Sequence, residues 1–97
     1  SRTPEIWYGH EAEAHEQLVE LYLALGRGDD AVQAVESALT RRRALTRREP
    51  HDPLLQRDLA GTLELAAEAR ELTGALDKAA EHRAEAARLF ERYGEDP

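Results

Sequence analysis

The chain contains the same helical pattern twice, and each copy breaks at a single glycine. The matching residues are Leu18, Tyr22, Gly26 and Ala31 in the first copy and Ala66, Gly74 and Ala79 in the second. Self-similarity of this kind is the sequence signature of a helical-hairpin repeat, which buries its apolar face by stacking on its neighbours. The pattern predicts an all-α fold and a function in presenting a surface to a partner.

Start and stop signals divide each copy into two helices of about 20 residues, a usual length for globular helices. Thr3 and Asp52 each precede a proline, and this pair starts a helix because the side chain caps free amides and proline tolerates the first helical position. Asp29 and Asp30 are expected to cap the second helix. Glycine tolerates the left-handed conformation after a helix, so Gly26 is expected to end the first one.

Short connections force consecutive helices to run antiparallel. We therefore expect two antiparallel αα-hairpins, over residues 4–49 and 52–94, stacked side by side in one domain that covers residues 1–97.

Apolar residues at three- and four-residue spacing predict which face of each helix is buried. The predicted inward stripes are Ala14, Leu18, Leu21, Tyr22 and Leu25; Ala31, Val35, Ala38, Leu39 and Leu45; Leu55, Leu59, Leu63, Ala66 and Ala69; and Ala79, Ala80, Ala86, Leu89, Phe90 and Tyr93. Leu18 and Tyr22 are expected to close the first hairpin against Ala31 and Val35.

Composition limits the setting of the chain. It has 97 residues, a net charge of −7, no cysteine and no methionine. The missing cysteine excludes disulfides and thiolate sites, and the missing methionine suggests a fragment of a longer protein. We see neither a membrane span nor a signal peptide, so we expect a cytoplasmic protein. Arginine outnumbers lysine twelve to one, a bias typical of GC-rich bacterial genomes.

The sequence gives little support for a catalytic or metal-binding site. His10, Glu11 and His15 lie close together in sequence, but one helix supplies too few converging ligands for a metal site. No phosphate-binding loop or nucleophile motif is present. We therefore expect no enzyme activity, no metal and no cofactor.

Five arginines, at positions 41–43, 47 and 48, are the one concentration of positive charge. They could contact phosphates, but the helix dipole and pairing with nearby acids explain them equally well, and the net charge disfavours nucleic acid as a partner.

The residues resemble tetratricopeptide repeats, whose helical hairpins carry leucine, tyrosine, glycine and alanine at characteristic positions. Leu18, Tyr22, Gly26, Ala31 and Ala38 match that pattern. The chain departs from it in four further positions, which are His15 for tryptophan, Val19 for a small residue, Val35 for an aromatic residue and Arg70 for the second tyrosine. The two glycines are 48 residues apart, against 34 in the standard repeat, so the chain looks similar to the extended arrays of high-GC actinobacteria.

In such arrays the first helix of each hairpin lines a concave groove. Carried onto this sequence, the resemblance implies a partner-binding surface made of Glu13, Glu16, Glu20, Leu23, Glu64, Glu68, Glu71 and Leu72. This groove would be acidic, and its expected ligand is a basic or mixed basic–apolar peptide or helix of a partner protein. A clamp for a C-terminal carboxylate is excluded, because asparagine is absent and the single lysine, Lys78, lies on a second helix.

The alternative reading is a structural four-helix bundle that forms a homodimer. Two hairpins leave both ends of the stack uncovered. Ile6, Trp7 and Tyr8 at one end, or Leu89, Phe90 and Tyr93 at the other, are then expected to be partly exposed and to seek a second copy.

Overall fold

The computed structural model describes the chain from residue 3 to residue 94, and its side chains from residue 7 onward. It contains four helices, which are α1 (Thr3–Ala24), α2 (Gly28–Arg48), α3 (Pro53–Leu72) and α4 (Leu76–Tyr93). No strand occurs in the described residues. The predicted all-α class is confirmed.

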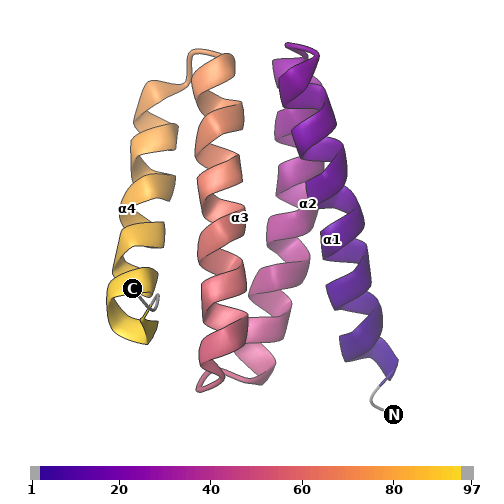
Figure 1. The fold of residues 1–97 in the computed structure, drawn as a ribbon, viewed down its shortest axis with the longest axis vertical. Coiled ribbons are helices and arrows are strands. Elements are labelled where there is room, and N and C mark those ends of the chain that lie inside the picture. Colours follow the sequence, from indigo (N-terminus) through magenta and orange to yellow (C-terminus); the bar gives the residue numbers. More distant parts are fainter. Residues whose placement is uncertain (1–2, 95–97) are drawn as a thin grey trace.

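Consecutive helices run antiparallel and form two hairpins, α1 with α2 and α3 with α4 (Figure 1). The hairpins stack through α2 and α3, and α1 also touches α3. As a result α1 and α4 form the two outer edges of the stack, and the molecule measures 37 × 29 × 22 Å. This is the stacked-hairpin arrangement that the repeated pattern predicts.

The two hairpins turn in the same way. Gly26 and Gly74 have φ angles of +72° and +84°, a region that glycine occupies without strain. The residue that follows each glycine donates its backbone amide to the carbonyl five residues earlier in the chain. Arg27 donates to Tyr22 and Ala75 donates to Arg70, both at 2.8 Å. These are the bonds of a Schellman motif, so the sequence repeat is also a repeat of backbone geometry.

The helix starts differ from one another. Asp52 caps α3 as predicted, because its side chain accepts hydrogen bonds from the amides of Leu54 and Leu55. The predicted cap of α2 is wrong: the helix already begins at Gly28, and Asp29 and Asp30 lie inside its first turn. The Schellman turn at Gly26 leads directly into the helix, so the two carboxylates meet the positive end of the helix dipole instead of capping it.

The core lies between α2 and α3 and is closed by one face of α1 and of α4. The predicted stripes of α2 and α3 are buried, apart from Leu55, which is half-buried. In α4, Ala79 and Ala86 are buried and Leu89, Phe90 and Tyr93 half-buried, but Ala80 is exposed and His82 takes an inward position. Alanines make up most of the buried apolar residues, so the helix axes can approach closely.

The predicted stripe of α1 is wrong except at Tyr22, which packs against the core. Leu18, Leu21 and Leu25 are 39%, 52% and 58% exposed, and Ala14 is exposed as well. The buried residues are Ala12 and Val19, with Tyr22 and Leu23 half-buried beside them. Val19 therefore closes the first hairpin in place of Leu18.

The physical reason is that α1 carries two apolar stripes with the same helical spacing. One runs through Ala12, Val19 and Leu23, and the other through Leu18, Leu21 and Leu25. Periodicity identifies a stripe but does not say which of two stripes faces the core.

Candidate functional site

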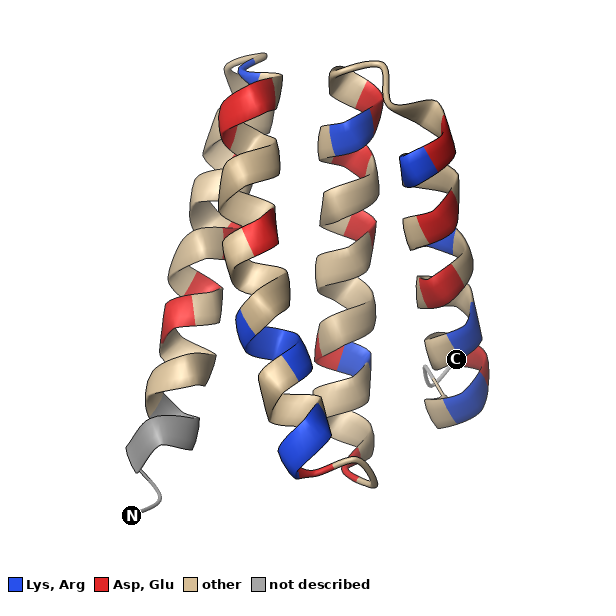
Figure 2. Cartoon of the chain, turned by 180° about the vertical axis from the view of Figure 1, so that it is seen from behind, with Lys and Arg blue, Asp and Glu red and all other residues tan. Residues whose placement is uncertain are grey.

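Three consecutive arginines of α2 bind acidic residues on the other helices. Arg41 Nε donates to Glu11 of α1 at 2.8 Å. Arg43 binds both carboxylate oxygens of Glu85 on α4, at 2.8 and 3.0 Å. Figure 2 shows these basic positions gathered in the C-terminal half of α2. Positions 41–43 of the arginine cluster thus connect helices within the molecule.

The middle arginine, Arg42, is 8% exposed and lies where α1, α2 and α3 meet. Its Nε and Nη2 donate to the two oxygens of Glu16 at 2.9 and 3.0 Å, and its Nη1 lies 3.7 Å from Asp58. The hydroxyl of Thr62 donates to the same carboxylate of Glu16. We call these four residues the Arg42 network.

Burial opposes the charge of Arg42, but the hydrogen bond to Glu16 and the charges of Glu16 and Asp58 outweigh it, so the pKa of Arg42 is raised. Glu16 is therefore committed to an internal ion pair. Its side chain is 18% exposed, so this predicted groove residue is mostly enclosed by the ion pair.

The other predicted groove residues lie on two helices. Glu13 and Glu20 are exposed on α1, and Glu64 and Glu68 are exposed on α3. Glu71 accepts two hydrogen bonds from Arg83 of α4, one from Nε at 3.2 Å and one from Nη2 at 2.9 Å. These hydrogen bonds lower the pKa of Glu71.

The two predicted apolar groove residues differ in exposure. Leu23 is half-buried and packs against the core, whereas Leu72 is 45% exposed at the end of α3. Only Leu72 is thus available as a predicted apolar contact at the surface.

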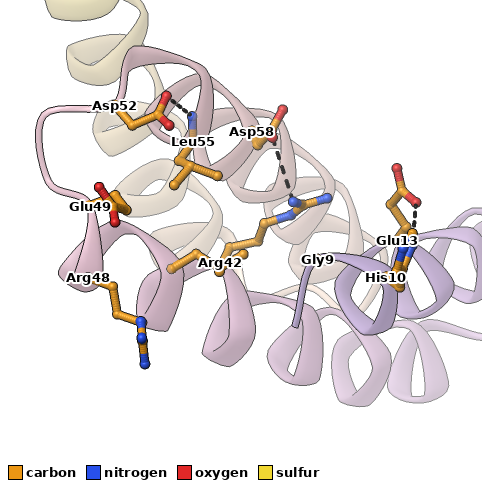
Figure 3. Close-up of a pocket in the computed structure, with 10 residues that line it drawn as sticks. Gly9, His10, Glu13, Arg42, Arg48, Glu49, Asp52, Leu55 and Asp58 are labelled. Atoms are coloured by element: carbon orange, nitrogen blue, oxygen red, sulfur yellow. Dashed lines mark hydrogen bonds and ion pairs between the residues drawn. The ribbon is translucent and has the colours of Figure 1, made fainter. Parts of the chain in front are cut away.

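A pocket of about 440 Å³ opens between the N-terminal halves of α1 and α3, with the C-terminal end of α2 as its floor (Figure 3). It is lined by Gly9, His10, Glu13, Arg42, Leu45, Arg48, Glu49, Asp52, Leu55 and Asp58. Figure 3 shows the Arg42 side chain extending toward Asp58. Two leucines thus form an apolar surface that four carboxylates surround.

A second pocket continues along the same two helices. It is lined by Glu16, Glu20, Arg42, Arg57, Asp58, Gly61, Thr62 and Leu65. Because Arg42 and Asp58 line both pockets, the two form one continuous surface. We call it the α1–α3 groove.

The pKa of Asp58 is affected by the charged residues around this groove. Burial raises its pKa first, Arg42 opposes that effect, and the negative charges of Glu16 and Glu13 raise it further. Carboxylates that disfavour one another in this way gain from a nearby cation. In the lining of the groove, six carboxylates outnumber three arginines, Arg42, Arg48 and Arg57.

Sequence reasoning missed the part of the site that follows the second helix. Leu45, Glu49, Asp52 and Leu55 come from the end of α2, the turn and the start of α3. The resemblance directed attention to first helices alone. The signal that could have found these residues is the pair of acids that flanks the Pro50 turn, since chain reversal brings them to one end of the stack.

Other kinds of site were also considered. In the described residues no three His, Cys, Asp or Glu side chains are arranged to hold a metal ion, and Glu11 of the histidine-rich segment is bound to Arg41. None of the helices between residues 3 and 94 has the length and hydropathy to cross a membrane.

The fold and the groove define a small stack of helical hairpins with a charged groove along its first helices. No model of a known protein family matches the sequence, and comparisons with characterised proteins and with solved structures give no significant match.

Proposed function

We propose that this chain is a non-enzymatic protein-interaction module, similar to tetratricopeptide repeats, whose α1–α3 groove binds a basic or mixed basic–apolar segment of a partner protein. The observation that carries this proposal is the pocket between α1 and α3, where Leu45 and Leu55 lie among the carboxylates of Glu13, Glu49 and Asp58.

Such a pocket suits a lysine or arginine side chain of the partner. The aliphatic stem of these side chains packs on apolar surface while the charged head stays near polar groups. Leu45 and Leu55 would contact the stem, and Glu13 and Glu49, both exposed, would bind the head group through charge-assisted hydrogen bonds. Apolar side chains on the same face of the partner would continue toward Leu65 in the second pocket.

Long-range electrostatics support the same choice of partner. The net charge is −7, and α1 contains no lysine or arginine at all. A net negative field around the groove increases the association rate of a positively charged partner more than it increases the affinity. Binding should therefore slow as salt is added, with the apolar contacts remaining.

The contact set differs from the one implied by the repeat resemblance. Glu13, Glu20, Glu64 and Glu68 are retained because they are exposed along the two first helices. Glu16 is assigned to the Arg42 network instead.

A fluorescent helical peptide of alternating lysine and leucine turns is the probe for this function, with a glutamate–leucine peptide of equal length for comparison. The site variant is Glu13→Lys/Glu49→Lys. Its matched control, Glu81→Lys/Glu91→Lys, makes the same change of net charge at exposed positions of α4.

We expect the wild type to bind only the lysine peptide, the site variant to bind it at least tenfold more weakly, and the control to bind it like the wild type at physiological salt. Equal losses in both variants would mean that net charge alone attracts the peptide. Equal binding of the two peptides would contradict the proposed function.

Composition supports a setting for this function. An arginine-rich, cysteine-free chain without a membrane-spanning helix in its described part fits a bacterial cytoplasm, which we include in the proposal.

A further inference from the structure

The outward face of α1 carries an apolar stripe that the described part of the chain leaves largely exposed. We call the following residues the α1 outer stripe: Trp7, Ala14, Leu18, Leu21 and Leu25. Trp7 is 59% exposed, and the three leucines are 39% to 58% exposed. Their three- and four-residue spacing is that of a helix face that packs along another helix.

The repeat itself indicates what kind of surface covers this stripe. Residues of the two hairpins correspond at an offset of 48, the distance between Gly26 and Gly74. Leu18 and Leu21 of α1 therefore correspond to Ala66 and Ala69 of α3, and both alanines are fully buried. Both belong to the same buried cluster as Val35 and Leu39 of α2, and α3 contacts both helices of the preceding hairpin. The face that is bare on α1 thus corresponds on α3 to a face that packs in a cluster to which α2 contributes.

The opposite edge of the same chain presents a helix that corresponds to α2. In Figure 1, α4 forms one edge of the stack and α1 the other. By the same offset, Ala80 and Ala87 of α4 correspond to Val32 and Leu39 of α2, which belong to the packing around the core. Ala80 and Ala87 are exposed, together with Ala84 and Leu76.

Side-chain sizes at the two edges compensate for each other. Within the chain, Leu39 of α2 and the alanines Ala66 and Ala69 of α3 belong to one buried cluster. At the edges the order is reversed, because α4 presents alanines and α1 presents leucines. Close packing requires the summed volume of the side chains across an interface to be maintained. An α4–α1 contact meets that requirement because it places alanines against leucines. An α1–α1 contact would instead place leucines against leucines.

Charge favours the same pairing. The sequence of α1 has five glutamates and no lysine or arginine, whereas α4 has four lysines and arginines balanced by four acidic residues. Two α1 helices placed side by side would repel each other, while α4 next to α1 adds no net negative charge to the contact.

We propose that the α1 outer stripe is a docking surface for α4 of a second copy of this chain, arranged as α2 and α3 are arranged within one chain. Each copy then offers one surface of each kind. Such a head-to-tail contact does not close on itself, so chains of copies grow with concentration. The contact involves one helix from each copy and is smaller than the roughly 1,200–2,000 Å² of stable interfaces, so association is weak and is completed only at high concentration. This inference does not depend on the groove proposal.

Two variants test the arrangement by complementation. Leu18→Glu/Leu21→Glu blocks the α1 outer stripe, and Ala80→Glu/Ala87→Glu blocks the outer face of α4. All four positions are exposed, and glutamate is a good helix former, so both variants should keep the helicity of the wild type. Leu54→Glu/Leu72→Glu is the matched control, because it makes the same kind of change at exposed positions of α3, which is neither of the two edge helices.

Sedimentation velocity is measured on the full chain from micromolar to millimolar concentration. We expect the wild type and the control to form dimers and larger species progressively, and each blocked variant to stay monomeric. An equimolar mixture of the two blocked variants should form a one-to-one heterodimer and nothing larger, because one intact surface of each kind remains.

Three results would overturn the proposal. The first is a wild type that is monomeric throughout, which would mean that some other molecule covers the stripe. The second is a variant blocked on α4 that still dimerises alone, which would indicate an α1–α1 contact. The third is a mixture that stays monomeric although the wild type associates. If a blocked variant loses helicity, the glutamine pair at the same positions replaces it, either Leu18→Gln/Leu21→Gln or Ala80→Gln/Ala87→Gln, and is judged by the same mixture.

Discussion

Replacing Arg42 by methionine should destabilise the fold more than any other single change of charge in the chain. Methionine retains most of the aliphatic stem and its packing, so the substitution removes mainly the guanidinium group. That group is buried and binds both oxygens of Glu16 while lying near Asp58. Its loss leaves the carboxylate of Glu16 between three helices with the hydroxyl of Thr62.

The expected magnitude follows from burial. Removing one partner of a buried ion pair costs about 3–5 kcal/mol, and the Glu16 side chain keeps 18% of its exposure, which places the loss near the lower limit. A loss of about 3 kcal/mol is a large part of the 5–15 kcal/mol that stabilises a typical domain. The melting temperature should fall by roughly 12 °C or more, since 1 kcal/mol corresponds to about 4–8 °C in a domain of this size.

Urea denaturation followed by far-UV circular dichroism measures this loss. Arg41→Met is the matched control, because its pair with Glu11 is more exposed and should contribute less than about 1 kcal/mol. The double variant Arg42→Met/Glu16→Leu should recover most of the stability, since apolar residues of similar volume often replace a buried pair without loss. Equal midpoints for Arg42→Met and Arg41→Met would refute the assignment of Arg42 as the centre of the network.

Three further predictions concern the core, the pH dependence and a helix cap. Val19→Ala should cost about 2 kcal/mol through two lost carbons and a cavity, whereas Leu18→Ala on the exposed stripe should change the urea midpoint little; the reverse order would contradict the buried face assigned to α1. Burial lowers the pKa of His82, and the charge of Lys78 lowers it further. As the pH falls, this histidine is therefore protonated in the unfolded chain before it is protonated in the folded one, and the free energy of unfolding should decline below pH about 6.5. A His82→Gln variant whose stability declines equally over that range would exclude His82 as the cause. Asp52→Ala should cost about 1 kcal/mol through the lost cap of α3, and an unchanged melting temperature would show that the cap is not needed.

The sequence predicted the buried face of a helix correctly where the helix carries a single apolar stripe. The stripes of α2 and α3 have polar residues on the opposite face, so a single side could be buried. In α1, Val19 and Leu18 are adjacent and belong to two stripes of equal spacing, and the choice between them depends on α2 and α3, which the local sequence does not contain. In the same way, the local sequence of α4 does not show that Ala80 is exposed and His82 buried, because this depends on how α4 packs on the other helices.

The candidate site was predicted in part. Glu13 and Glu20 could be assigned from their places on the first helix. The role of Glu16 could not, because its partners, Arg42 and Thr62, are 26 and 46 residues away along the chain. The pocket also depends on the meeting of three helix ends, which no spacing rule describes.

The measurement that tests the central claim most directly is a two-dimensional ¹H–¹⁵N NMR titration of the full chain with the lysine–leucine peptide. The account predicts saturable shifts of the backbone amides that line the groove, such as those of Gly9, Leu45, Leu55 and Gly61, with little change along the outer face of α4. Shifts confined to α4 or to the outer stripe of α1, or uniform shifts without saturation, would contradict the groove as the binding surface.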